Sequence, residues 1–136
     1  MLGILIHKEL DGNSQLNNII KKNTYPLVVP DGIEIPHIAY GVRVFPPDYS
    51  KVSVNIGQSV VDHSEAMLEI SSSKYKELQE IMGYVRVAIE GKKLIFQSIE
   101  TKAITLYSQE EHYNNKTRNY NGVMVFKVDH NRLING

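Results

Sequence analysis

A proline-punctuated segment constrains the fold of this chain more than any other feature. It runs from Tyr25 to Tyr40, reads YPLVVPDGIEIPHIAY, and holds three of the chain's five prolines. Its apolar residues are typical of strands. Proline has no backbone N–H, however, so within a sheet it is confined to edges, strand starts and bulges. We therefore expect this segment to be extended chain at the margin of a sheet rather than at its centre.

The composition indicates a single soluble domain over residues 1–136, and 42% hydrophobic residues exclude a disordered chain. Fifteen basic residues balance fifteen acidic ones, so no basic field attracts nucleic acid, and we expect no sequence-specific nucleic-acid binding. The chain has no cysteine, which excludes disulfides and thiolate metal sites. No apolar window is long enough for a signal peptide or a membrane span, so we expect no membrane association.

Two short helices are predicted before the proline segment. The first ends at Asp11–Asn13, where a glycine interrupts the pattern, and Ser14 can cap the second. Both are too short to persist alone in water, so they must pack on something larger. Their apolar faces are Leu2, Leu5, Ile6 and Leu10 in the first helix and Leu16, Ile19 and Ile20 in the second.

Strict alternation predicts a strand over His37–Phe45 and another over about Val60–Ser71. Pro46–Tyr49 ends the first of these, and Ser50–Ser59 is interpreted as a partly extended loop or a hairpin arm. In the second strand one face is expected to be buried and the other open. The buried face holds Ala66, Leu68 and Ile70, and the open face holds Glu65, Met67 and Glu69.

The strongest helix signal spans Ser73–Glu90, where apolar residues recur at steps of three and four. Ser72 or Ser73 is the expected N-cap, and Gly91 the expected stop. The stripe that should be buried consists of Tyr75, Leu78, Met82, Val85 and Ile89.

Strands are predicted over residues 94–107 and 123–129, separated by the polar stretch Ser108–Gly122. Helices and strands therefore follow each other in the order helix, strands, helix, strands. This order predicts an α+β fold: a mixed, mainly antiparallel sheet with the long helix and the short N-terminal helices packed on one face.

The sequence shows no constellation of catalytic residues, so we expect no enzyme, no metal and no cofactor. None of the five histidines lies in a recognisable metal motif, and the chain lacks phosphate-binding loops, dinucleotide fingerprints and nucleophile elbows. The segment Asp62–Glu65, DHSE, contains an acid, a base and a nucleophile. Neighbours on a strand point to opposite faces, however, so it is interpreted as the solvated start of a strand.

The order of elements resembles the phage tail-completion family, also called tail-terminator or head-to-tail joining proteins. The matching features are the two short helices, a Tyr-Pro pair, a proline-bearing connection and a strand ending in tyrosine, with His37 where an aromatic is common. The resemblance continues through the Asp-containing strand, the Ser-rich start of the long helix, VRVAIEG, SQEEHYNN and GVMVFKVD, and so covers nearly the full length. The residues of its first part are Tyr25-Pro26, Pro30-Asp31-Gly32 and Pro36 to Tyr40.

The resemblance implies a structural role. Such proteins assemble as a hexameric ring that caps the tail tube, ends its growth and docks the head connector protein. The expected partners are therefore other copies of this chain, the tail tube protein and the head connector. The expected location is the virion tail of a phage or prophage, with assembly in the bacterial host cytoplasm.

Two alternatives are retained. One is another small virion neck or contractile-system assembly component with the same fold. The other is a small enzyme with an unrecognised site, which would need a pocket lined by His37, His63 and Asp62. In the assembly interpretations, function is expected in the long loops Val29–Pro36, Pro46–Ser59 and Ser108–Gly122. The exposed apolar candidates for the assembly interface are Ile33, Ile35 and Tyr49.

Overall fold

Two long antiparallel strands organise the sheet, β3 (Ser59–Ser72) and β7 (Asn119–Leu133). The computed structural model describes residues 2–45, 59–96 and 99–133. Its helices are α1 (Leu2–Asp11), α2 (Ser14–Ile20) and α3 (Tyr75–Ile89). The remaining strands are β1 (Thr24–Pro26), β2 (His37–Phe45), β4 (Ile95–Phe96), β5 (Ile99–Thr101) and β6 (Thr105–Asn114).

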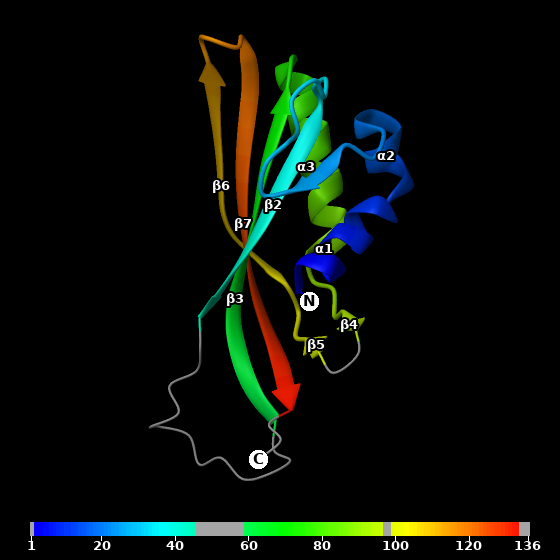
Figure 1. The fold of residues 1–136 in the computed structure, drawn as a ribbon, viewed down its shortest axis with the longest axis vertical. Coiled ribbons are helices and arrows are strands. Elements are labelled where there is room, and N and C mark those ends of the chain that lie inside the picture. The colour runs from blue at the N-terminus through cyan, green and yellow to red at the C-terminus, as the bar shows by residue number, and fades with distance from the viewer. Residues whose placement is uncertain (1, 46–58, 97–98, 134–136) are drawn as a thin grey trace.

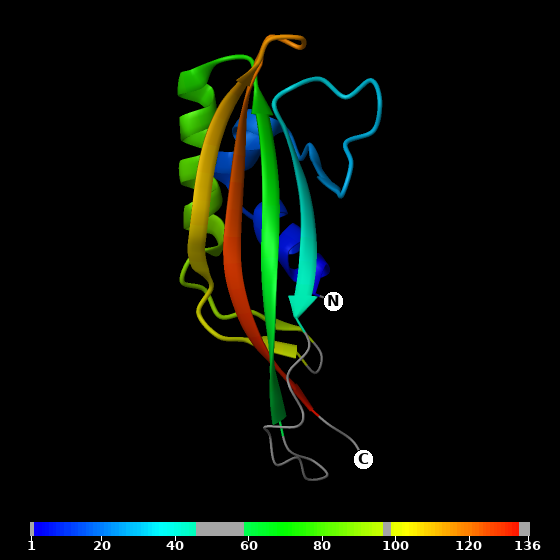
Figure 2. The same ribbon diagram turned by 90° about the vertical axis from the view of Figure 1, so that its left-hand side faces the viewer.

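The described strands form a seven-stranded mixed sheet in the order β1-β2-β3-β7-β5-β4, with β6 pairing the other half of the same edge of β7. Only β1 and β2 pair in parallel; the other pairs are antiparallel. All three helices lie on one face of the sheet, as Figures 1 and 2 show. The predicted α+β architecture is confirmed. No helix within the described ranges is long and apolar enough to cross a membrane.

The core lies between the helices and the sheet. Helix α3 packs on β3 and β7, and α1 and α2 pack against α3. The alternation expected along β3 is confirmed, because Ala66, Leu68 and Ile70 are buried on the helix side. The largest fully buried side chains include Phe126, Ile6, Leu10, Leu16, Ile20, Ile38, Leu78 and Met82.

Helix α3 buries the predicted stripe except at its first residue. Leu78, Met82, Val85 and Ile89 are buried, but Tyr75 is half-exposed, so that part of the prediction is wrong. Tyr75 lies where the helix has just begun, and its ring meets the edge of Tyr120 at 5.7 Å between centroids. The periodicity of a helix gives the direction of a side chain but not how far the sheet beneath it extends.

The ends of α3 show which capping expectations hold. The helix begins at Tyr75, and its N-cap is Lys74 rather than Ser72 or Ser73. Ser72 contributes from one turn earlier: its Oγ accepts from the Lys74 N–H at 3.3 Å and donates to Glu77 Oε1 at 2.7 Å. Gly91 follows the helix at φ 76°, a left-handed conformation that glycine adopts without strain. The predicted glycine stop is confirmed.

The expectation that Ser108–Gly122 is a polar connection is wrong. It forms most of β6, a four-residue turn and the start of β7. Asn114 closes the turn: its carbonyl accepts from the Arg118 N–H at 2.7 Å, and its Oδ1 accepts from the Lys116 N–H at 2.9 Å. Strand β6 lies at an edge and most of its side chains are exposed, so no buried face imposes an apolar alternation.

The strand predicted over residues 94–107 is also interrupted. It contains the short strands β4 and β5 and then the beginning of β6. The expected position at the sheet margin holds for Tyr25–Pro36, because β1 is the outermost strand of its edge and Leu27–Pro36 continues from it outside any helix or strand. It is wrong for the end of the segment, because Ile38–Tyr40 of β2 pair with β1 on one side and β3 on the other. The predicted connection Pro46–Ser59 lies outside the described residues apart from Ser59, the first residue of β3.

Candidate functional site

The sheet face that points away from the helices, the open face, carries an apolar strip across its three central strands. Met67 of β3 stands between Gly41 of β2 and Val125 of β7, its partners in the strand register. In the neighbouring row Glu69 stands between Ala39 and Val123. Met67 is 45% exposed, and the helices lie on the opposite face of the sheet (Figure 2).

The segment after β1 curls beside this strip and hollows the surface. Leu27 and Val28 are 77% and 75% exposed, the largest exposed fractions among the described large apolar side chains. Leu27 lies close to Gly41, where an added Cβ would stand 3.3 Å from Leu27 Cδ2, so a glycine leaves room for its approach. Two adjoining hollows of about 160 and 250 Å³ result, lined mainly by Leu27, Val28, Val29, Ala39, Met67 and Val123.

Two titratable side chains line this surface, His37 and Glu69. The His37 ring lines the larger hollow beside Glu69. Burial lowers the pKa of the His37 imidazole below its ordinary value, and the Glu69 carboxylate opposes that shift. Within the described residues its Nδ1 is buried without a hydrogen-bond partner. The lowered pKa favours the uncharged ring, which still offers one donor and one acceptor nitrogen at the wall of the hollow.

Neither Ile33 nor Ile35 lines these hollows, and both are less exposed than the sequence predicted. Ile33 and Ile35 are half-buried in the segment that curls beside the strip, where the Ile33 N–H donates to the Pro30 carbonyl at 3.4 Å. Tyr49 lies outside the described residues. Leu27 and Val28 were missed, although the prolines flanking the apolar run Leu27–Val29 already indicated that it could not enter the sheet. The interface role of all these residues stays a prediction.

The pocket required by the enzyme alternative is not formed by the described residues. His37 pairs with Ser71, whereas His63 lies eight residues away along β3, about 26 Å at the rise of a strand. His63 Nδ1 instead contacts Asp129 Oδ1 at 2.8 Å in an exposed pair. The side chain of Asp62 is not among those that the structure describes. The solvated interpretation of Asp62–Glu65 is wrong for Ser64, which is buried with its Oγ 3.0 Å from His130 Nε2.

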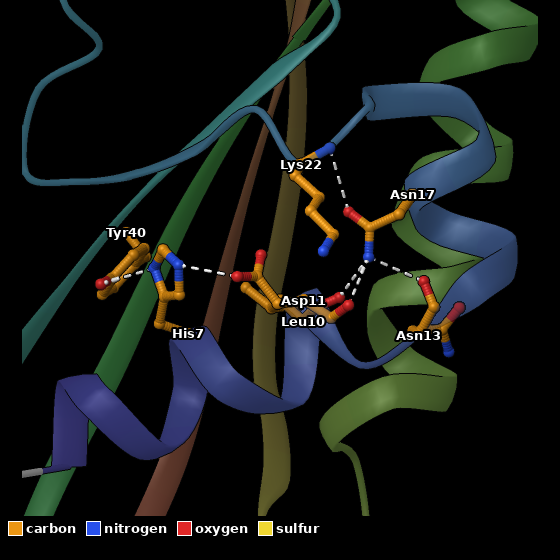
Figure 3. Close-up of polar contacts among 7 residues, drawn as sticks. All are labelled: His7, Leu10, Asp11, Asn13, Asn17, Lys22 and Tyr40. Carbon is orange, nitrogen blue, oxygen red and sulfur yellow. Dashed lines mark hydrogen bonds and ion pairs between the residues drawn. The ribbon is translucent and has the colours of Figure 1, made fainter.

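A chain of polar contacts links α1 to β2 (Figure 3). His7 Nδ1 lies 3.0 Å from the Tyr40 hydroxyl, and His7 Nε2 lies 3.1 Å from Asp11 Oδ2. A hollow of about 470 Å³ opens beside them. Burial and the Asp11 charge raise the pKa of Tyr40, so its hydroxyl keeps its proton and can donate to His7. A phenol held in this form is a poor nucleophile, and the arrangement fits a link between helix and sheet.

The side chain of Asn17 in α2 bonds to the backbone between α1 and α2 (Figure 3). Its Nδ2 donates to the carbonyls of Leu10, Asp11 and Asn13 at 2.8–2.9 Å, and its Oδ1 accepts from the Lys22 N–H at 3.2 Å. The carbonyls of Leu10 and Asp11 are in the last turn of α1, where carbonyls lack the usual partner within the helix, and Asn13 is the N-cap of α2, so the Asn17 amide links the end of one helix to the start of the next. Among the described residues, including this region, no group of three or more histidines and carboxylates is placed to hold a metal ion.

Comparisons of sequence find no relative: no family model and no curated protein matches the chain. Comparison of structures finds a similar chain in the virion of a native gene transfer agent (GTA) particle. The two chains superpose with a TM-score of 0.77 at 13% sequence identity, and the match covers 96% of this chain and 94% of the other. At this identity the likeness shows a shared fold.

Proposed function

We propose that this chain is a structural component of a phage or prophage virion, and specifically a tail-completion protein. In this role it caps the tail tube as a hexameric ring and joins the tube to the head connector protein. The likeness to a chain of a gene transfer agent virion carries the proposal. It covers nearly all of both chains, so the complete fold is shared and not a common fragment.

The surface supports an assembly role. Leu27, Val28 and Met67 expose a continuous apolar area around two hollows on a face that no described helix covers. Exposed apolar patches rimmed by polar residues are typical of interaction sites. The formal net charge of zero lets identical copies approach without strong repulsion. Ile33, Ile35 and Tyr49 remain the candidate interface residues, to which the structure adds Leu27 and Val28.

The proposed partners are other copies of this chain, the tail tube protein and the head connector. The proposed location is the virion tail, with assembly in the cytoplasm of the bacterial host. The role needs no catalytic residue and no cofactor. In this role the polar contacts among His7, Asp11 and Tyr40 serve as a structural link between α1 and β2.

Tube termination tests this function directly. The purified chain is added to polymerising tail tube protein, and tube lengths are measured by electron microscopy. We expect tubes that stop growing and carry a ring at one end. Tubes of unchanged length without a terminal ring, at saturating concentrations of the chain, would contradict the proposal.

The second candidate is another neck or contractile-system component. The same structural likeness favours it, because a shared virion fold does not single out the tube end. The two roles differ in position, so the chain is labelled and located in intact particles. Density on the last tube ring supports tail completion, whereas density confined to the connector above it supports the neck component.

A further inference from the structure

The sheet has two free edges among its described strands. On one side β6 pairs with β7 alone, so the outer side of its ten residues faces no described strand. On the other side β1 pairs with β2 only at Ile38–Tyr40, and no described strand pairs with Gly41–Phe45 along that edge. A strand edge with unpaired N–H and C=O groups is a template for pairing with another chain.

The backbone of β2 presents hydrogen-bonding groups to that open side. The Ile38 N–H donates to the Asn23 carbonyl at 2.8 Å, and the Tyr40 carbonyl accepts from the Leu27 N–H at 2.7 Å, both toward β1. Along a strand, successive residues direct these groups to opposite sides. Val42 and Val44 therefore direct theirs outward, beyond the end of β1.

Strand direction allows these two edges to meet. Strands β2, β3, β7 and β6 are neighbours in that order and each pair is antiparallel, so β2 and β6 run in opposite directions. If the symmetry axis of a ring runs along the strands, rotation from one copy to the next leaves the direction of each strand unchanged. In a cyclic ring, β6 of one copy is then antiparallel to β2 of the next, in a head-to-tail contact that closes by rotation.

Charge selects the pairing. Strand β6 carries Glu110 and Glu111 and no lysine or arginine, whereas Arg43 is the only such charge on β2. Two β6 strands would bring carboxylates together, which is unfavourable across a ladder. Glu110 and Arg43 both lie on the open face. Glu110 is in the same row of register partners as Glu69, and Arg43 pairs with Glu65, and both of these residues of β3 lie on that face. Opposing Glu110 to Arg43 places Ser108 opposite Phe45.

This register gives a regular stagger. Within one copy, Glu110 of β6 is the register partner of Val123, Val123 that of Glu69, and Glu69 that of Ala39. Glu110 and Ala39 therefore lie in the same row across the sheet. Pairing with Arg43 of the next copy shifts the level by four residues, 43 minus 39, over four strands. The register therefore shifts by one residue per strand. A closed barrel of eight strands and shear 8 has the same ratio of shear to strand number, and its strands tilt by about 36°. The same shift sets Ser108–His112 opposite Gly41–Phe45, the part of β2 that β1 does not pair.

We propose that copies of this chain join edge to edge, with Ser108–His112 of β6 pairing antiparallel to Gly41–Phe45 of β2 in the next copy, Glu110 opposite Arg43. The partner is a second copy of the chain, and the inference rests on the proposed ring. Each junction extends the sheet of one copy into the next.

Cysteine cross-linking tests this register without background, because the chain has no cysteine. Phe45 and Ser108 would form a non-hydrogen-bonded pair with Cα atoms about 4.5 Å apart, within the range that a disulfide bridges. Phe45→Cys/Ser108→Cys should give a ladder of linked copies on a non-reducing gel after mild oxidation. The matched control Phe45→Cys/His112→Cys keeps both strands and the open face but moves one thiol by about 13 Å along β6, so we expect no ladder.

The remaining outcomes overturn the inference. Equal ladders in both double variants contradict the register, and dimers from Ser108→Cys alone indicate β6 pairing with itself. Light scattering of the wild-type chain separates this inference from the proposed function. A wild-type ring with no ladder in Phe45→Cys/Ser108→Cys refutes the edge pairing and leaves tail completion standing. A ladder from a chain that fails to terminate tubes supports the pairing and refutes tail completion.

Discussion

Gly122 of β7 lies directly beneath Met82 of α3, with no room between them for a side chain at residue 122. A Cβ added to Gly122 would stand 2.7 Å from Met82 Sδ and 3.2 Å from Leu78 Cδ1. The glycine therefore sets how closely the long helix approaches the sheet, which is the contact that closes the core.

Gly122→Ala should lower the free energy of unfolding by about 1–3 kcal/mol, because the buried methyl group forces Met82 and Leu78 to move. The control is Gly83→Ala on the exposed side of α3, where an added Cβ meets nothing within 4 Å. It should raise stability by about 0.5–1 kcal/mol through helix propensity. Urea unfolding of the two variants checks the pair, and a neutral Gly122→Ala would contradict the close approach.

Leu78→Ala should destabilise the protein by about 2–5 kcal/mol, because Leu78 is fully buried and its truncation leaves a cavity. Val87→Ala on the same helix is the comparison, since Val87 is 64% exposed. Its effect should stay within about 0.5 kcal/mol. Denaturant unfolding of both variants measures the difference, and similar losses would show that the helix register is wrong.

Stability should fall as the pH is lowered below about 6.5, the ordinary pKa of histidine. Burial lowers the pKa of His37 in the folded state, so the unfolded chain binds its proton at a higher pH than the folded chain does. In that window the unfolded state holds more protons, and acid favours unfolding. His37→Gln should flatten the pH dependence of the melting temperature, and an unchanged slope in that variant would contradict this origin of the acid sensitivity.

Tyr40→Phe should cost about 0.5–1.5 kcal/mol, the usual net value of a hydrogen bond, by removing the hydroxyl that contacts His7. Tyr25→Phe is the control, because the Tyr25 hydroxyl donates to Asn23 at 3.4 Å, near the limit for a hydrogen bond. Thermal unfolding followed by circular dichroism compares them. A larger loss from Tyr25→Phe would exclude the proposed link between α1 and β2.

Leu27→Glu should leave the melting temperature nearly unchanged but prevent ring formation or tail completion, because Leu27 is 77% exposed and packs little in the single copy. Ile33→Glu tests the predicted interface in the same way. Circular dichroism measures folding, and light scattering together with tube termination measures assembly. Unfolding of the Ile33→Glu monomer would place Ile33 in the core, and normal assembly by both variants would remove this surface from the interface.

The sequence alone determined the buried faces of the regular elements. The alternation of Ala66, Leu68 and Ile70, and the helical spacing of Leu78, Met82 and Val85, predicted which sides face the core, and the structure buries all six. The prolines placed Tyr25–Pro36 at the sheet margin, although not the following residues Ile38–Tyr40, which pair on both sides. These properties are local: burial imposes a period on the side chains, and a missing N–H confines proline to sheet edges, strand starts and bulges.

Tertiary structure alone decided the rest. Strand β6 is exposed and carries no periodic apolar face, so only its pairing with β7 makes it a strand. Tyr75 continues the apolar stripe of α3, but the core ends before it does. The hollow beside Leu27 depends on Gly41 and Met67 from two other strands. Pairing, the extent of the core and surface shape depend on contacts between residues far apart in the chain, and local periodicity does not encode such contacts.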